Sequence, residues 1–277
     1  KAVGVSLFHS VAAFNNSGFD MLGGGQNLIP YQDDVFLNLV TCALVILGGI
    51  GFLVIREVIE KRFRWKKFSM HTKVVLFMSL VLTAAGTVLL KLTEDITWLG
   101  AFFTSVSART AGFSTFPLGS FSGAGLLTVI VLMVIGASPG STGGGIKTTT
   151  CYVLFEGIRS SATNTSEKAF RYAVPADAFR KAAVITLLAL GIVLTGTYIL
   201  VILEPGVPFL DALFEMSSAF GTAGLSTGIS TGLCDAAKLL TILIMFIGRL
   251  GPLTIASLWY FTKGERVSFP EGNIAIG

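Results

Sequence analysis

Three short glycine-containing stretches of the sequence share one pattern, and each lies between a short apolar segment and a long one. They are Phe14–Phe19 (FNNSGF), Ala108–Phe113 (ARTAGF) and Phe220–Leu225 (FGTAGL). A permeating cation needs oxygen ligands that replace its water, and backbone carbonyls supply these in ion filters. Glycine lacks a Cβ and leaves the backbone free to turn its carbonyls inward. The pattern therefore predicts the walls of a cation pore.

The residues expected to bind the ion are the triplets at the centre of each stretch. They are Asn16, Ser17 and Gly18; Thr110, Ala111 and Gly112; and Thr222, Ala223 and Gly224. The apolar residues that follow, Phe19, Phe113 and Leu225, are expected to pack around the filter.

Composition indicates a membrane protein, because 52% of residues are hydrophobic, 13% are charged and the mean hydropathy is +0.77. Five long apolar runs predict membrane spans: Val35–Ile55, Val74–Leu90, Phe121–Ile146, Ala182–Leu203 and Leu239–Thr262. Three shorter apolar stretches precede the glycine motifs and predict re-entrant pore helices: Val3–Ala13, Ile96–Ala108 and Phe209–Phe220. Asp95 and Asp211 are expected to cap two of these helices.

Charge sets the orientation. Basic residues crowd two connections, residues 56–73 and 159–181, which are therefore expected to be cytoplasmic. Acidic residues flank the glycine motifs on the other side and would concentrate cations there. The net charge of +4 thus reflects inner loops and not a nucleic-acid surface.

A repeat extends beyond the triplets. From the triplet glycine to a glycine in the following apolar run, the separation is 24 residues from Gly112 to Gly136 and from Gly224 to Gly248, and 30 from Gly18 to Gly48. We therefore expect an all-α membrane protein of repeated helix–re-entrant loop–helix units around a pore. The predicted units are residues 1–66, 67–160 and 161–277.

The third long run is interrupted by a segment that disfavours a helix: Gly136, Ala137, Ser138, Pro139, Gly140, Ser141, Thr142, Gly143, Gly144 and Gly145. Glycine costs about 1 kcal/mol and proline about 3 kcal/mol in a helix interior. Irregular backbone at membrane depth survives only inside protein or beside water. The segment is expected to line the pore, with a packing kink as the alternative. A phosphate-binding loop does not fit, because Ile146 separates the last glycine from Lys147.

The motifs at 107–113 and 140–147 resemble those of the Trk/Ktr/HKT superfamily of potassium transporters, most closely the bacterial KtrB-type membrane subunit. The resemblance implies potassium uptake across the bacterial plasma membrane, with the 136–145 loop as a gate and Na⁺ as a candidate coupling ion. It also implies a homodimer on a cytosolic, KtrA-like RCK ring that binds the nucleotide. Family members have four repeats, so an N-terminal repeat and one outer helix are expected to be missing here.

Three basic residues lie near this pathway. Arg109 is expected to point away from the ion and brace the filter, because a guanidinium facing it would oppose cation flow. Arg249 matches a family residue that projects into the pore as an electrostatic barrier, with pinning of the loop carbonyls as the alternative. Lys147 either belongs to the gate or extends to the cytoplasmic boundary.

Two other functions are alternatives to potassium transport. A sodium- or ammonium-permeable transporter of the same fold is the main alternative, although a central glycine in each motif goes with potassium preference in the superfamily. An intramembrane enzyme is less favoured, because the spans contain no Ser/His pair, paired Asp motif or His cluster. Membrane lipid is the other expected partner, through the basic 56–73 connection.

Overall fold

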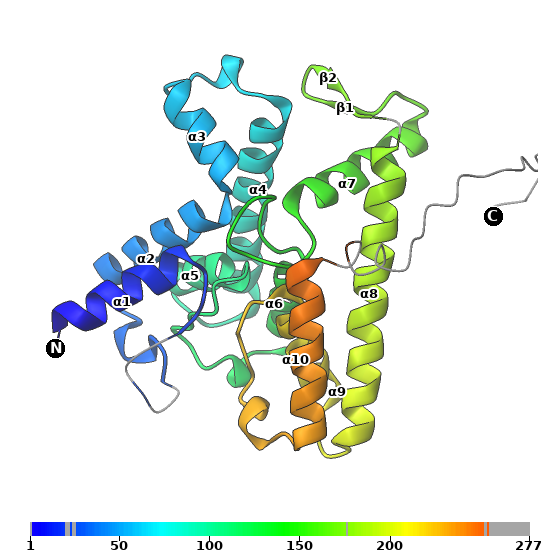
Figure 1. Cartoon of the computed structure of the whole chain (residues 1–277). Coiled ribbons are helices and arrows are strands. Elements are labelled where there is room, and N and C mark those ends of the chain that lie inside the picture. Colours follow the sequence, from blue (N-terminus) through cyan, green and yellow to red (C-terminus); the bar gives the residue numbers. More distant parts are fainter. Residues whose placement is uncertain (1, 20–22, 24–25, 176, 252–253, 255–277) are drawn as a thin grey trace, which may run out of the picture.

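The computed structural model describes residues 2–19, 23, 26–175, 177–251 and 254. This part of the chain is mostly helical, with irregular loops between the helices and a small hairpin formed by β1 (Lys168–Ala169) and β2 (Tyr172–Ala173) (Figure 1). Short 3-10 turns η1 (Ile29–Tyr31), η2 (Trp65–Lys67), η3 (Leu118–Ser120) and η4 (Ile229–Gly232) join the helices.

The helices fall into three recurring roles. Three short apolar helices end at the glycine motifs: α1 (Ala2–Phe14), α5 (Trp98–Ala108) and α9 (Phe209–Gly221). Each is followed by an inner helix: α2 (Val35–Gly49), α6 (Gly123–Val134) and α10 (Asp235–Leu250). Two long outer helices, α4 (Met70–Thr93) and α8 (Ala178–Leu203), precede α5 and α9. At 11 to 13 residues, the pore helices are too short to cross a bilayer.

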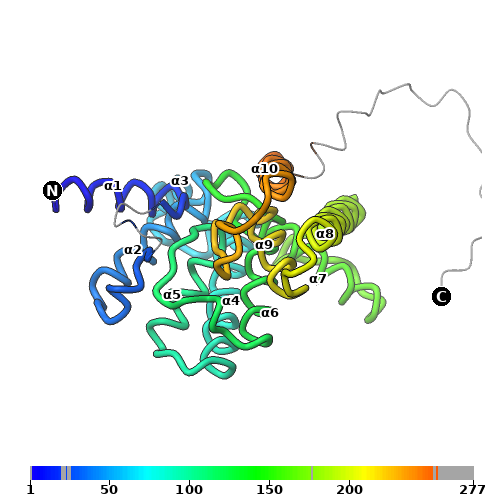
Figure 2. The backbone as a smooth tube through the Cα atoms, turned by 90° about the horizontal axis from the view of Figure 1, so that it is seen from below, coloured from blue at the N-terminus to red at the C-terminus, as the bar shows by residue number. Residues whose placement is uncertain are grey.

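The outer helices pack in the same way in both complete units. Helix α4 contacts α5 and α6, and α8 contacts α9 and α10. Inner helices then join neighbouring units, because α2 packs on α5 and α6 packs on α9. Seen from below, α1 and α8 lie on opposite sides of the molecule, with α5 and α9 between them (Figure 2). The units are therefore arranged side by side and not stacked.

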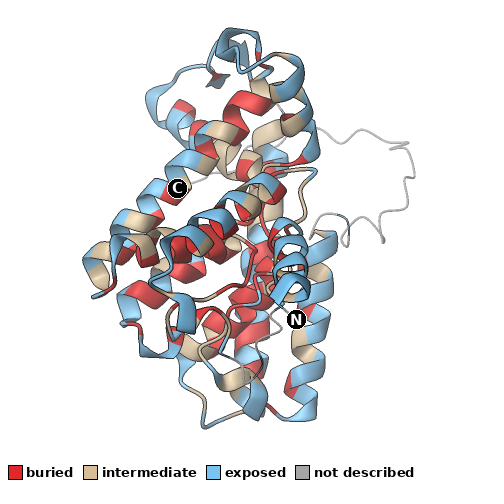
Figure 3. Ribbon diagram, turned by 90° about the vertical axis from the view of Figure 1, so that its left-hand side faces the viewer, coloured by how far each residue is buried: buried red, intermediate tan, exposed pale blue. Residues whose placement is uncertain are grey.

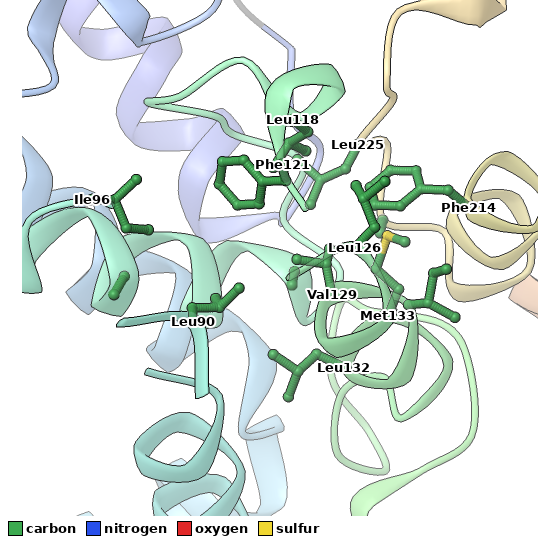
Figure 4. Packing of buried hydrophobic residues seen from close by; sticks show 14 residues of the cluster. Leu90, Ile96, Leu118, Phe121, Leu126, Val129, Leu132, Met133, Phe214 and Leu225 are labelled. Atoms are coloured by element: carbon green, nitrogen blue, oxygen red, sulfur yellow. The ribbon is translucent and has the colours of Figure 1, made fainter. Parts of the chain in front are cut away.

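Buried residues, red in Figure 3, form clusters both within units and between them: one cluster lies mainly among α8, α9 and α10, and another joins α4, α5 and α6 to α9. Leu126, Val129 and Met133 on one face of α6 meet Phe214 of α9 and Leu225, which follows the third triplet (Figure 4). The outward faces of the long helices remain apolar and exposed; Leu80 on α4 and Leu187 on α8 are each 70% exposed. Such faces suit a lipid environment.

Among the residues that the structure describes, two helices, α4 and α8, are long and apolar enough to cross a membrane, and α2 with α3 (Phe52–Glu60) would make a third if the bent pair counts as one span. The predicted span Leu239–Thr262 lies in part outside the described residues. The run expected to cross as Val35–Ile55 instead bends by 98° between α2 and α3. Gly51 at the bend has φ 90° and ψ 144°. Helix α10 ends the same way, at Gly251 with φ 90° and ψ 138°.

The remaining inner run, Phe121–Ile146, is broken as expected. Helix α6 ends at Val134, an irregular loop follows, and α7 (Thr148–Thr163) continues the chain. One pore-helix cap was predicted wrongly: α5 begins at Trp98, and the Thr97 hydroxyl, not Asp95, accepts the hydrogen bond from Gly100 N–H at 3.1 Å. Asp211 lies in the first turn of α9, but the N-cap residue of that helix is Pro208 and no side chain makes a cap hydrogen bond there.

Candidate ion pathway

The three triplets adopt the same backbone conformation. The first and third residues of each have positive φ: Asn16 51° and Gly18 67°, Thr110 77° and Gly112 80°, Thr222 51° and Gly224 81°. An ordinary extended chain directs successive carbonyls to opposite sides, whereas left-handed residues at alternate positions turn them toward one side. The repeated conformation is therefore suited to lining one axis with oxygen atoms.

The triplets also meet in space. A Cβ on Gly18 would lie 2.8 Å from the Ala111 oxygen, and one on Gly112 would lie 2.4 Å from the Ala223 oxygen. A Cβ on Gly224 would lie 3.7 Å from the Gly112 Cα. Segments about 100 residues apart in sequence thus lie side by side, as a shared filter requires. Of the residues expected to pack around them, Phe113 and Leu225 are buried, whereas Phe19 is 68% exposed.

Close packing of pore helix on inner helix holds two of the triplets. A Cβ on Gly48 would lie 1.9 Å from the carbonyl oxygen of Phe14, the last residue of α1. A Cβ on Gly248 would lie 1.9 Å from the carbonyl oxygen of Phe220, near the end of α9. These aligned glycines therefore let the backbones touch directly beside the triplets.

Arg109 points away from the triplets. Its guanidinium donates hydrogen bonds to the Ser79 carbonyl oxygen at 3.3 Å, the Ser79 hydroxyl at 3.4 Å and the Thr83 hydroxyl at 3.5 Å. Both partners lie on the outer helix α4. These residues line a cavity of about 270 Å³ that reaches Ala137. The geometry ties the second triplet, residues 110–112, to the outer helix α4, as a brace would.

Glu215 is a residue that the sequence analysis did not single out. It lies on α9, is 5% exposed, and accepts hydrogen bonds from the Ser226 hydroxyl and, at 2.9 Å, from the Ser230 hydroxyl. Ser226 in turn accepts from Gly228 N–H at 2.9 Å. The carboxylate therefore holds the segment that leaves the third triplet. The sequence feature that could have identified Glu215 is a charged residue within an apolar pore helix.

The positions aligned with Glu215 are His9 on α1 and Phe103 on α5. His9 Nε2 is hydrogen-bonded to the Thr41 hydroxyl at 2.8 Å, and its ring packs edge-on against Phe113 at 5.0 Å. His9 thus has a packing role. The three units thus have a carboxylate, an imidazole and a phenyl ring at the same aligned position.

The 136–145 loop lies between the triplets and the ends of the inner helices. Ser138 N–H donates to the Gly49 oxygen at 3.0 Å, and Thr142 N–H donates to the Gly48 oxygen at 3.3 Å. On its other side, Gly144 N–H donates to the Thr222 hydroxyl at 3.0 Å. The loop therefore contacts both α2 and the base of the third triplet.

Glycine is required where the loop meets the triplets. A Cβ on Gly143 would lie 2.1 Å from the Thr110 hydroxyl oxygen, and one on Gly144 would lie 2.5 Å from that of Thr222. Gly140 has φ 71° and Gly145 φ 70°, conformations that residues with side chains rarely adopt. The remaining loop residues, Gly136, Ala137, Pro139 and Ser141, complete the crossing between α6 and α7.

Two cationic side chains bind carbonyl oxygens of this loop. Arg249, near the end of α10, donates to the Thr142 oxygen, and Lys147 Nζ donates to the Gly143 oxygen at 2.7 Å. None of the ion pairs within the described ranges includes either residue. The loop is thus held from α2 on one side and by Arg249 on another.

The comparison with protein families identifies this arrangement. The model of the TrkH family, described as "Cation transport protein", matches residues 1–94 and 65–262. Ktr system potassium uptake protein B of Bacillus subtilis is 37% identical over 286 residues, which cover 98% of this chain and 63% of the relative. The protein of the same description from Vibrio alginolyticus is 35% identical, over 98% of this chain and 62% of the relative.

A third relative is named for sodium as well as potassium uptake. Potassium/sodium uptake protein NtpJ of Enterococcus hirae is 34% identical, over 100% of this chain and 65% of its own length. The chain thus spans a little under two thirds of these relatives.

The fold is similar to the crystal structure of the potassium transporter TrkH from Vibrio parahaemolyticus. The TM-score is 0.75 at 20% identity, over 92% of this chain and 58% of that one. The expected all-α, potassium-channel-like fold and the resemblance to Ktr and Trk proteins are confirmed. This chain is a multi-pass membrane protein that belongs to the TrkH family of cation transport proteins.

Proposed function

We propose that the chain supplies three walls of a potassium-selective pore in an uptake transporter of the bacterial plasma membrane. The observation that carries this proposal is the shared left-handed conformation at Gly18, Gly112 and Gly224, in segments that meet. The carbonyls of the nine triplet residues are the proposed K⁺ ligands. The relatives named for potassium uptake support the choice of ion.

The 136–145 loop is the proposed gate. It lies between the triplets and the ends of the inner helices, where ions leaving the filter would have to pass. Hydrogen bonds to Gly49, Thr222 and Arg249 support a closed position. The charges of Lys147 and Arg249 add an electrostatic barrier to cations at the same place.

The proposed assembly is larger than this chain. A further repeat and outer helix of the same polypeptide would complete the ring, and two copies would sit on a KtrA-like cytosolic RCK ring. The names of the Ktr system relatives support a partner subunit. In this proposal the regulating nucleotide binds to that partner, and the chain itself holds no cofactor and catalyses no reaction.

Sodium is the second candidate ion. The name of the Enterococcus hirae relative includes sodium as well as potassium. Sodium would act either as a coupling ion or as a second permeant ion, and ammonium is a further candidate with the same charge.

Uptake in potassium-starved cells that lack their own transporters tests the proposal. The intact polypeptide should rescue growth at low potassium, and its Gly112→Ser variant should lose rescue or admit sodium, because the added Cβ would clash with the Ala223 oxygen. Gly191→Ser is the matched control, since a Cβ there meets nothing within 4 Å. Equal rescue by both variants would remove Gly112 from the filter.

A further inference from the structure

Helix α3 and the turn after it, residues 52–67, form a segment that displays apolar side chains on its surface. Phe52, Ile59, Phe63 and Trp65 are 65%, 69%, 81% and 45% exposed. The axis of α3 lies at 98° to that of α2, so the chain turns sharply between the two helices (Figure 1). An open groove of about 430 Å³ runs along α3 beside Phe52, Ile55, Arg56 and Ile59.

Basic side chains lie among these apolar ones. Arg56 and Lys61 are paired with Glu60 and Glu57. Four further residues, Arg62, Arg64, Lys66 and Lys67, are exposed, and no ion pair in the described part of the chain includes them. The segment thus carries unneutralised positive charge beside exposed phenylalanine and tryptophan.

We propose that residues 52–67 lie in the cytoplasmic membrane–water interface and bind the headgroups of anionic phospholipids. Helices that lie in this interface combine lysine and arginine with exposed aromatic and aliphatic residues. The cytoplasmic leaflet is the anionic one, and it attracts basic segments next to membrane spans. Trp65 is well placed to set the depth of this segment in the interface, because its ring is held by edge-on packing against Phe68 and Phe170.

This surface is joined directly to the 136–145 loop. Phe52, the first residue of α3, donates its N–H to the Gly140 oxygen at 3.1 Å. A Cβ on Gly140 would lie 3.3 Å from the Phe52 ring. Lipid bound to α3 therefore fixes a residue that contacts the loop, and anionic lipid should shift the opening of the gate. This last step rests on the proposed function, whereas the lipid binding does not.

Tryptophan fluorescence tests the binding. The intact transporter, altered so that Trp65 is its only tryptophan, is placed in phosphatidylcholine vesicles containing equal fractions of brominated phosphatidylglycerol or brominated phosphatidylcholine. Brominated phosphatidylglycerol should quench Trp65 more strongly. Lys66→Gln with Lys67→Gln should weaken that preference by on the order of tenfold. Arg180→Gln with Lys181→Gln, which removes two charges from the start of α8, should leave it unchanged.

Two outcomes would overturn the proposal. Equal quenching by both lipids, unaffected by loss of Lys66 and Lys67, would mean that the segment touches lipid without selecting its charge. Protection from both quenchers would mean that a cytosolic partner or a second copy covers it. Potassium uptake by the same vesicles tests the transport proposal separately. If brominated phosphatidylglycerol quenches Trp65 more strongly but no lipid composition supports uptake, the lipid site is supported and the transport proposal is refuted.

Discussion

Glu94 and Glu204 make the same contact in successive units: each carboxylate accepts a hydrogen bond from the backbone N–H of the residue that precedes an inner helix. The donors are Ser122 N–H at 3.0 Å, before α6, and Cys234 N–H at 2.6 Å, before α10. Each glutamate is also the residue that ends an outer helix. A negative charge at a helix N-terminus is stabilising. The same residue thus links outer to inner helix in both complete units.

Glu94→Gln should destabilise the protein. Its Oε1 also accepts from the Ser122 hydroxyl at 2.6 Å, so the change removes the charge from two hydrogen bonds. We expect a loss of ~1 kcal/mol and a melting temperature lower by about 2–4 °C in detergent. The control is Glu60→Gln, whose partner Arg56 lies in an exposed pair. An equal shift in both variants would contradict the capping role.

The cap at Glu204 predicts a pH dependence. The hydrogen bond from Cys234 N–H lowers the pKa of the Glu204 carboxyl below its ordinary value. Its contribution to stability is therefore present above the unfolded glutamate pKa of about 4.3 and is lost as the pH falls through the lower folded value. Thermal scans of the parent and of Glu204→Gln should differ at pH 7 and converge toward pH 3. A constant difference across this range would refute the cap.

Glu215→Gln should loosen the segment after the third triplet. The neutral amide has one acceptor oxygen where the carboxylate has two, so both the Ser226 and Ser230 hydroxyls lose a charged partner and one of them loses its acceptor, at a cost of about 1–3 kcal/mol. We expect a lower potassium-to-sodium selectivity, measured as competing ion fluxes in vesicles. Asp211→Asn on the same helix is the control and should keep selectivity. Unchanged selectivity in Glu215→Gln would make the carboxylate a folding element only.

The repeat and its glycines could be predicted from sequence because the physical requirement is local. A position where a Cβ would come closer than 3 Å to neighbouring backbone admits only glycine, and Gly112 and Gly248 are two such positions. The broken inner helix could be predicted for a similar reason, because Pro139 and its glycines disfavour a helix whatever surrounds them.

The features that could not be predicted depend on contacts with residues distant in the sequence. Gly51 lies in an uninterrupted apolar run, and its conformation depends on the Gly140 oxygen, to which the next residue, Phe52, donates a hydrogen bond. Asp95 and Thr97 are both acceptable caps by residue type, and only the backbone path selects Thr97. The partners of Glu215 come from a loop whose course no periodicity fixes.

Thr222→Val should ease opening of the 136–145 loop. The change removes the hydroxyl that accepts from Gly144 N–H and keeps the volume of the side chain. Losing one hydrogen bond of ~1 kcal/mol shifts a two-state equilibrium about fivefold. We expect faster uptake in the absence of the proposed cytosolic partner, measured in vesicles, whereas Thr222→Ser, which keeps the hydroxyl, should behave as the parent. Slower uptake in both variants would instead place the effect on the filter itself.

Arg249 offers the sharpest test of the loop as a gate, because charge and hydrogen bonding can be separated there. Arg249→Gln keeps a donor for the Thr142 oxygen and removes the charge, whereas Arg249→Leu removes both. If pinning dominates, uptake without the partner should rise in Arg249→Leu but little in Arg249→Gln. If the electrostatic barrier dominates, it should rise in both, and more steeply at low ionic strength. Parent-like uptake in both variants would show that the loop does not limit ion flow.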